Sequence, residues 1–477
     1  MRIKATVLLV LLLGIHFTAC TQKEVTRPNI LFIEVDDLEY EYLSMNGAPE
    51  LKTPNIDKLA KSGVYFRNAV AQGMMCGPSR NSLITGLYPH NLGFYRNGQL
   101  KKLPDGVWTF PQGLQRSGYY TAWIGKCHIR AGGKNNLKTQ AMKNEMGFDQ
   151  VTLTEGRAVL CSKVKKGKYS ENDWYLSYLI SKGKFETFKK ECGKPTTLDD
   201  QTYLDGFFTH AALNFLNDYK TDKPFFLWLN YSVPHGPWDV AEKYHIYDPE
   251  KMPGSTKGNF TPPENLVKAT KVITDNETIK KRQAGFCANI NFLDQQIGKI
   301  LKTLKDKDLY DNTIIVFFSD QGVMMGDHQR IHKGTLYRQI TNPALIISWP
   351  AKMKQDLVVK DPVELTDLIR TTFEIAGVSK KDINKRKYSV SLLPALMKGE
   401  KVDRKYAFGE IEGFIMVTDG RYRLIKGEDT ALLFDDLKDP KNLNDISAGH
   451  PEIVKELSDA IDNWIAETGK PLPPRSF

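Results

Sequence analysis

The run Cys76-Gly77-Pro78-Ser79-Arg80 combines a thiol, a turn-forming dipeptide and a permanent cation within five residues. Cys76 is a candidate for covalent catalysis, and Arg80 would face the same site as a fixed cation. The same run is compatible with an ordinary cysteine that precedes a turn and the start of a helix. The choice between the two interpretations depends on what the rest of the chain places around Cys76.

Acidic and amide side chains follow two apolar runs of the chain. Asp36 and Asp37 come after the first run, and Asp320 and Gln321 come after the second. Their oxygens are hard ligands, which suit Ca²⁺ or Mg²⁺ rather than zinc. Alone, Asp36-Asp37 would be interpreted as helix capping or turn chemistry. Asp320 after a second run favours a shared cation site.

Two lysines and two histidines could act on a transferred anionic group. They are Lys126 and His128 in one short motif, His235 after another apolar run, and Lys333. Fixed cations that face developing negative charge make a large contribution to catalysis. Histidine titrates near neutral pH and suits general acid or base catalysis. Each histidine taken singly would be interpreted as structural.

The predicted elements explain how these side chains converge. Four apolar runs are predicted as strands buried in the middle of a parallel sheet: 29–35, 225–231, 313–318 and 344–349. Helices are predicted over 53–62, 110–117, 207–219 and 284–304. Alternating strands and helices indicate an α/β fold, in which ligands bind at the carboxyl ends of the strands. Three of the four runs lead into acidic residues or histidine at those ends.

The pattern changes from about Asp367. Two short apolar runs around Asp419-Gly420 predict a hairpin, and 453–468 predict an amphipathic helix. We therefore expect a catalytic domain over residues 27–366 and a C-terminal α+β subdomain over 367–477. The lysine-rich segment 131–202 is interpreted as an insertion near the mouth of the site.

An ordered set of motifs resembles the type I sulfatase family. The set spans the chain from Pro28 to its C-terminus. A lone C-x-P-S-R run would be moderately specific, whereas the ordered set is highly specific. The motifs are Asp36-Asp37, Cys76-Gly77-Pro78-Ser79-Arg80, Gly125-Lys126-Cys127-His128, Pro234-His235-Gly236-Pro237, Ser319-Asp320-Gln321-Gly322, Lys333 and Leu433-Phe434-Asp435.

The resemblance implies an alkaline phosphatase-like sandwich. It would have a large mixed, mostly parallel sheet flanked by helices, and a smaller C-terminal subdomain with an antiparallel sheet. It also implies that a formylglycine-generating maturation enzyme converts Cys76 to formylglycine (3-oxoalanine). The implied metal is Ca²⁺, with Mg²⁺ as the alternative. Its expected ligands are Asp36, Asp37, Cys76, Asp320 and Gln321.

The resemblance also assigns roles to individual residues. His128 is expected to be the base that collapses the formylglycine hydrate, and His235 the acid toward the leaving alcohol, shared with Lys333. Asn97 matches a substrate-binding asparagine of some relatives, although Asn-Gly is also a plain turn motif. The expected catalytic residues are Cys76, Arg80, Lys126, His128, His235 and Lys333, and the expected substrate-binding residues are Asn97, Lys126, His235 and Lys333.

The leading functional hypothesis is hydrolysis of sulfate esters on a sulfated carbohydrate, such as a glycosaminoglycan, a mucin or another glycan. The alternatives are a phosphonate monoester or phosphodiester hydrolase of the same superfamily and a choline-type sulfatase. A non-catalytic binding protein on this scaffold is the alternative from another class. The full set of charged site residues argues against loss of catalysis.

The N-terminus predicts export. Residues 1–19 have a basic start and an apolar run too short to span a bilayer, as in a signal peptide. Phe17-Thr18-Ala19-Cys20 resembles a lipobox, so we expect lipidation of Cys20 and location in the periplasm or at the cell surface; ordinary cleavage near Ala19 is the alternative. Membrane contact is expected only through this anchor.

Charge and the remaining cysteines add little to these expectations. The net charge of +10 comes from scattered lysines, which indicate a solvated surface and no nucleic-acid partner. Cys161 and Cys192 are compatible with a disulfide or with buried free thiols.

Overall fold

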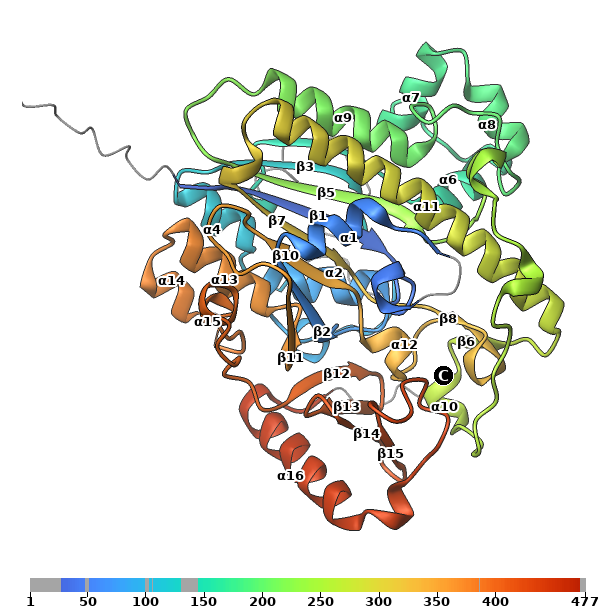
Figure 1. Cartoon of the computed structure of the whole chain (residues 1–477), viewed down its shortest axis with the longest axis vertical. Helices are drawn as coiled ribbons and strands as arrows, with labels where there is room; N and C mark the ends of the chain where they lie inside the picture. The colour runs from blue at the N-terminus through green and yellow to red at the C-terminus, as the bar shows by residue number, and fades with distance from the viewer. Residues whose placement is uncertain are drawn as a thin grey trace, which may run out of the picture.

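The computed structural model describes residues 27–47, 51–98, 103–104, 106–129, 145–385 and 387–471 (Figure 1). The predicted signal peptide and Cys20 lie outside these residues. Among the described residues, no helix is both long enough and apolar enough to cross a membrane.

A large sheet of eight strands forms the centre of the molecule, in the order β11-β2-β10-β7-β1-β5-β3-β4 (Figure 1). Strand β10 runs antiparallel to both of its neighbours, and the other pairings are parallel. The strands are β1 (Asn29–Asp36), β2 (Val64–Val70), β3 (Tyr120–Lys126), β4 (Gln150–Thr154), β5 (Phe225–Pro234), β7 (Thr313–Ser319), β10 (Leu345–Ser348) and β11 (Leu357–Glu364).

The central strands are apolar on both sides because both faces of the sheet are covered. In β1, Ile30 and Phe32 belong to one core cluster, whereas Leu31 and Ile33 belong to the other. Strands β5 and β7 are fully buried along their lengths. The four predicted strands are confirmed as β1, β5, β7 and β10.

Helices form the outer layers of this sandwich. The face that contains Leu31 is covered by α1 (Pro54–Lys61), α9 (Leu204–Asp218) and α11 (Asn276–Asp306), of which α9 and α11 cross the front of Figure 1. The opposite face is covered by α2 (Cys76–Thr85), α4 (Phe110–Arg116) and α13 (Asp367–Ala376). The predicted helices are confirmed, with α11 beginning eight residues before the predicted start at 284.

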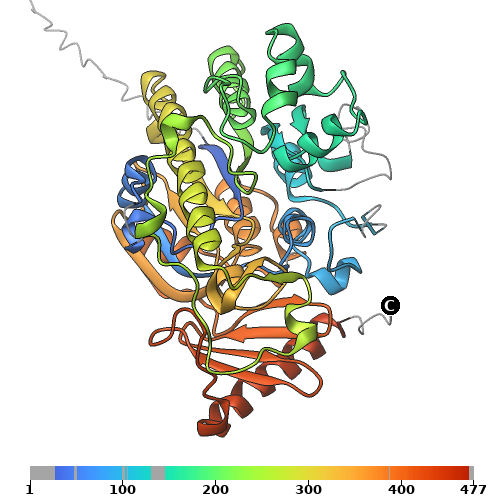
Figure 2. The same cartoon turned by 90° about the vertical axis from the view of Figure 1, so that its right-hand side faces the viewer.

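A second, four-stranded antiparallel sheet lies at one end of the molecule (Figure 2). Its strands follow one another as β12 (Ala407–Ile411), β13 (Phe414–Thr418), β14 (Tyr422–Lys426) and β15 (Ala431–Asp435). Helix α16 (Pro451–Thr468) packs on this sheet through Trp464. The predicted hairpin is β13–β14, with Gly420 at φ 93° in its turn. The expected fold class is thus confirmed.

The predicted boundary at residue 366 stays a prediction. Helix α13, which follows it, packs against the large sheet's helical layer, where Phe373 stacks on Trp108 with ring centroids 6.0 Å apart. Helices α14 (Lys380–Asn384) and α15 (Leu393–Lys398) come between α13 and the antiparallel sheet. The remaining short elements are α3 (Pro89–Leu92), α10 (Glu264–Val267), α12 (Arg338–Thr341), and the sheet of β6 (Thr270–Val272), β9 (Arg330–His332) and β8 (Met324–Met325).

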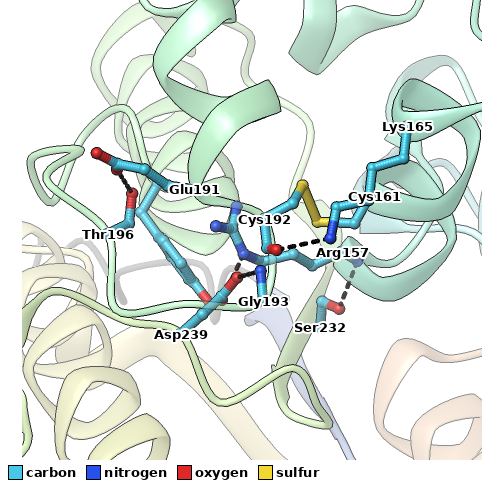
Figure 3. The surroundings of a disulfide bond; sticks show 10 residues. Arg157, Cys161, Lys165, Glu191, Cys192, Gly193, Thr196, Ser232 and Asp239 are labelled. Carbon is cyan, nitrogen blue, oxygen red and sulfur yellow. Dashed lines mark hydrogen bonds and ion pairs between the residues drawn. A yellow bond between two sulfur atoms is a disulfide. The ribbon is translucent and has the colours of Figure 1, made fainter. Parts of the chain in front are cut away.

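The prediction of an insertion over 131–202 is wrong in part, because residues 150–154 form strand β4 of the large sheet. The described residues after β4 form three helices and carry a disulfide (Figure 3). The helices are α6 (Arg157–Lys165), α7 (Trp174–Ser181) and α8 (Phe185–Glu191). Cys161 of α6 is bridged to Cys192 at the end of α8. Beside the bridge, the buried Arg157 donates a hydrogen bond from Nε to Asp239 Oδ1 at 2.6 Å. The insertion is therefore fastened to the segment that follows β5.

Candidate active site

Cys76 is the first residue of α2 and is buried at the carboxyl end of the large sheet. Its thiol donates to Asp36 Oδ1 at 3.1 Å. Lys333 Nζ donates to Cys76 Sγ at 2.8 Å, and Gln321 Nε2 lies 3.6 Å from the same sulfur. Burial raises the pKa of this thiol to about 12, with neighbouring carboxylates adding to the shift and Lys333 opposing it. Unconverted Cys76 is therefore a protonated thiol at neutral pH.

The acidic residues meet because β1 and β7 are parallel neighbours. Val35 pairs with Ser319, so the residues that follow them leave the sheet side by side. The backbone N–H of Asp37 donates to Asp320 Oδ1 at 3.2 Å. Asp37 has a φ of 72°, an unfavourable value for a residue with a Cβ, which turns the chain sharply at the site.

These residues fit a hard divalent cation. One ligand atom each from Asp36, Cys76 and Asp320 lies within 4.8 Å of the others. Gln321 donates through Nε2 to Asp37 Oδ1, while its Oε1 is buried and has no hydrogen-bond partner among the described residues. A buried amide oxygen without a donor, next to three buried carboxylates, is suited to Ca²⁺ or Mg²⁺.

Arg80 lies one turn along α2 and faces the same carboxylates. Its Nε donates to Asp320 Oδ2 at 2.9 Å, and Nη1 lies 3.3 Å from Glu34 Oε1. Burial opposes the charge of Arg80, but Glu34 and Asp320 outweigh burial and raise its pKa above the ordinary value. Burial likewise opposes ionisation of Asp320, whose pKa is nevertheless lowered by Arg80, Lys333 and Lys126. Arg80 is thus a fixed cation.

The two site lysines have different electrostatic surroundings. Lys126, the last residue of β3, forms an ion pair with Asp36, and Lys333 forms one with Asp37. Burial and the charge of Lys333 lower the pKa of Lys126 to about 7. Burial opposes the charge of Lys333, but Asp37 and Cys76 raise its pKa above the usual value. Lys126 can therefore exchange a proton near neutral pH, whereas Lys333 remains charged.

Both predicted histidines border this cluster. The backbone N–H of His235 donates to the Asp36 carbonyl at 3.0 Å, and its Nε2 lies 3.8 Å from Asp37 Oδ2. The Nδ1 of His128 is buried without a hydrogen-bond partner among the described residues. Burial and the charges of Lys126 and Lys333 hold the pKa of both histidines well below the ordinary value. Both imidazoles are neutral in the substrate-free site.

The structure places Asn97 beside the start of α2. Its Oδ1 accepts a hydrogen bond from the backbone N–H of Gly77 at 2.8 Å, and a Cβ on Gly77 would meet that same oxygen. Asn97 therefore holds the helix end that carries Cys76, and its predicted contact with substrate stays a prediction. Nearby, Arg96 forms an ion pair with Glu412 of the C-terminal subdomain at 3.0 Å.

Three polar residues of the site were given no role from the sequence, although Ser79 and Ser319 lie within its motifs. Glu34 is fully buried next to Arg80, and burial raises its pKa to about 7 although Arg80 opposes the shift. Ser79 Oγ donates to the Asp320 carbonyl at 2.5 Å, and Ser319 Oγ accepts from the Leu38 N–H at 2.8 Å. A single glutamate within the apolar run NILFIEV was the one signal that could have revealed Glu34.

The arrangement can polarise and stabilise a small tetrahedral anion. The sulfur of Cys76 contacts Asp36 Oδ1 and Lys333 Nζ, and Gln321 Nε2 lies 3.6 Å from it. Lys126 and Arg80 pair with the neighbouring carboxylates. Preorganised cations of this kind stabilise negative charge that develops in a transition state.

Comparisons with known proteins identify the family. A family model described as Sulfatase matches residues 28–378. A sulfatase of Formosa agariphila is 30% identical, over 90% of this chain and 86% of that protein. An N-acetylglucosamine-6-O-sulfatase of Bacteroides thetaiotaomicron is 25% identical, over 79% of this chain and 73% of that protein.

Solved structures show the same fold. The phosphonate monoester hydrolase of Agrobacterium radiobacter has a TM-score of 0.77 and 22% identity, covering 93% of this chain and 96% of its own. A protein solved in complex with its substrate D-glucosamine-2-N,6-O-disulfate has a TM-score of 0.72 and 21% identity, covering 94% and 99%. With the family model matching most of its length, the chain belongs to the sulfatase family and is a sulfuric ester hydrolase.

Proposed function

We propose that the protein hydrolyses sulfate esters of a sulfated carbohydrate, using formylglycine made from Cys76 and a bound divalent cation, Ca²⁺ or Mg²⁺. The observation that carries this proposal is the position of Cys76, buried between Asp36 and Lys333 within hydrogen-bond distance of both. A thiol is poorly suited to the reaction, because an S-linked sulfate has no easy exit. Conversion by a formylglycine-generating enzyme would remove this obstacle.

Formylglycine, once hydrated, would supply one hydroxyl as the nucleophile toward sulfur and a second whose deprotonation expels sulfate and restores the aldehyde. The cation, held by Asp36, Asp37, Asp320, Gln321 and residue 76, would polarise the nucleophile and bind a sulfate oxygen. Lys126 and Lys333 would bind the remaining charge of the sulfate group. Arg80 keeps Asp320 ionised and so maintains the ligand set.

The two histidines would move the protons of the reaction. His128 is neutral, and its buried Nδ1 has no hydrogen-bond partner among the described residues. The base that collapses the hydrate must be a neutral imidazole of this kind. His235 would protonate the leaving alcohol. A bound sulfate would place negative charge beside His235, which favours its protonated form.

The carbohydrate substrate is supported by relatives named for sugar sulfates, including the N-acetylglucosamine-6-O-sulfatase and an N-acetylgalactosamine-6-O-sulfatase. The test is a panel of saccharides, each with one sulfate at a defined position, incubated with converted protein while released sulfate is measured. We expect turnover of at least one member. Faster hydrolysis of a phosphodiester or a phosphonate monoester than of every sulfated sugar would contradict the proposal and favour the alternative hydrolase. Faster hydrolysis of choline sulfate than of every sulfated sugar would instead favour a small-molecule sulfatase.

We also propose that the protein is exported and anchored through Cys20. The Cys161–Cys192 bridge supports export, because disulfides persist in oxidising compartments. Cell fractionation after labelling with a fatty acid tests both parts. We expect label in the wild-type protein and none in Cys20→Ala; an unlabelled wild type in the soluble periplasm would support cleavage near Ala19 instead.

A further inference from the structure

Helix α11 holds an aromatic side chain beside the active site. Residues 282, 285 and 289 lie on one face of this helix, following its three-to-four residue repeat. Gly285 leaves room for Trp238, whose Cβ is only 3.0 Å from where a Cβ on residue 285 would lie. Trp238 Nε1 in turn donates to the Pro234 carbonyl at 3.1 Å. The indole is therefore fixed next to His235.

Arg282 stacks on this indole without an anionic partner. Its guanidinium carbon lies 4.6 Å from the Trp238 ring centroid. Among the residues that the structure describes, Arg282 Nε is buried and has no hydrogen-bond partner. Among the same residues, no carboxylate pairs with the guanidinium. The acidic residues nearby are engaged elsewhere, since Glu277 pairs with Lys281 and Glu250 with Lys280. Partial burial without a nearby carboxylate lowers the pKa of Arg282, and an anionic ligand would offset this effect.

The same arginine is electrostatically linked to the catalytic cluster. His332 immediately precedes Lys333, the lysine that contacts Cys76. Burial lowers the pKa of His332, and the positive charges of Arg282, Lys333 and Lys271 add to this shift. Strand β6 pairs with β9, with Thr270 opposite His332. Arg282, Lys271 and Lys333 therefore form a positively charged rim around His332.

We propose that Arg282, held against Trp238, binds a second anionic oxygen group of the substrate, either a carboxylate or another sulfate, with His332 and Lys271 on the outer rim. The proposal rests on the proposed sulfatase function and narrows its substrate class to saccharides with an additional anion near the scissile sulfate. The planar guanidinium fork can bind either group through two parallel hydrogen bonds. The indole limits the orientations of the fork and so prepares it for such a ligand.

The first test compares three forms of the sugar sulfate that the wild type desulfates fastest: the form with one sulfate, a form with a second sulfate, and a form linked to a uronic acid. Arg282→Gln should raise KM at least about 10-fold for a doubly anionic form, with kcat little changed and the monosulfated form unaffected. The affected form identifies the group as sulfate or carboxylate. Lys281→Gln, one residue away on an exposed site, is the matched control.

The second test separates this inference from the proposed function. Cys76→Ala with and without Arg282→Gln is titrated calorimetrically with the monosulfated and doubly anionic sugars, so that binding is measured without turnover. Loss of preference for the doubly anionic sugar on removal of Arg282 supports the subsite, even if the wild type releases no sulfate and the proposed function fails. Equal effects of Arg282→Gln on all sugars, no effect on any, or the same change from Lys281→Gln would overturn the inference.

Discussion

Lys333 Nζ lies 2.8 Å from Cys76 Sγ, although 257 residues separate them along the chain. The contact joins the segment after β9 to the first residue of α2, directly over the carboxyl ends of β1 and β7. Since Lys333 also pairs with Asp37, one ammonium group touches both the residue to be converted and an expected metal ligand.

Replacement of Lys333 should therefore impair chemistry more than folding. We expect Lys333→Gln to lower kcat for sulfate release at least about 100-fold, because a cation that faces developing charge is lost. Lys302→Gln, an exposed lysine paired with Asp306 on α11, serves as the control. Retention of half of the wild-type kcat by Lys333→Gln would contradict the assigned role.

Removal of the cation should abolish activity. A chelator and Asp320→Asn are each expected to lower sulfate release at least about 100-fold. Each should also remove the bound metal, which elemental mass spectrometry measures. Asp320→Asn should also destabilise the fold, since Arg80 is then left buried with one fewer carboxylate. Unchanged activity in both experiments would refute the cation site.

The Cys161–Cys192 bridge should contribute stability rather than chemistry. It closes a segment of 31 residues, for which loop-closure entropy predicts about 3–4 kcal/mol of stabilisation. We expect the double change of both cysteines to serine to lower the free energy of unfolding by that order while kcat stays close to wild type. A large loss of kcat with little loss of stability would instead indicate that the bridge positions catalytic residues.

Stability should depend on pH through Asp294. This buried carboxylate accepts hydrogen bonds from the first residues of α1, and burial raises its pKa from 3.8 to about 6 despite those bonds. The folded state binds the Asp294 proton more tightly than the unfolded state does. Protonated Asp294 therefore stabilises the folded state at low pH, and this stabilisation is lost as the pH rises through about 6. Between roughly pH 4 and 7, the wild type should lose as much as about 3 kcal/mol relative to Asp294→Asn. A pH-independent difference between the two proteins would contradict this assignment.

The buried centre of the fold could be predicted from the sequence, whereas the edges of the large sheet could not. Strands β1, β5 and β7 are continuous apolar runs because helices cover both of their faces. Strand β2 contains Arg67 and Asn68, and Asn68 Nδ2 donates to the carbonyls of residues 360 and 420. The edge strand β11 contains Pro362, where the register shifts. Such strands depend on partners that are remote in the chain.

A similar division holds for the site. Residues that directly follow a predicted strand, such as Asp36 and Asp320, could be placed together because parallel strands end at one edge of the sheet. The contact of Asn97 with Gly77 depends on how a loop closes over α2, which no periodicity encodes. The ion pair between Arg96 and Glu412 likewise could not be predicted, because it depends on where the C-terminal sheet lies relative to Arg96.

The most direct measurement is sulfate release by protein produced together with a formylglycine-generating enzyme, with the mass of the peptide containing residue 76 determined on the same sample. We expect an aldehyde at residue 76 in active protein, and no detectable sulfate release by Cys76→Ala or by wild-type protein that retains the thiol. Equal sulfate release by Cys76→Ala and converted wild type would contradict this expectation.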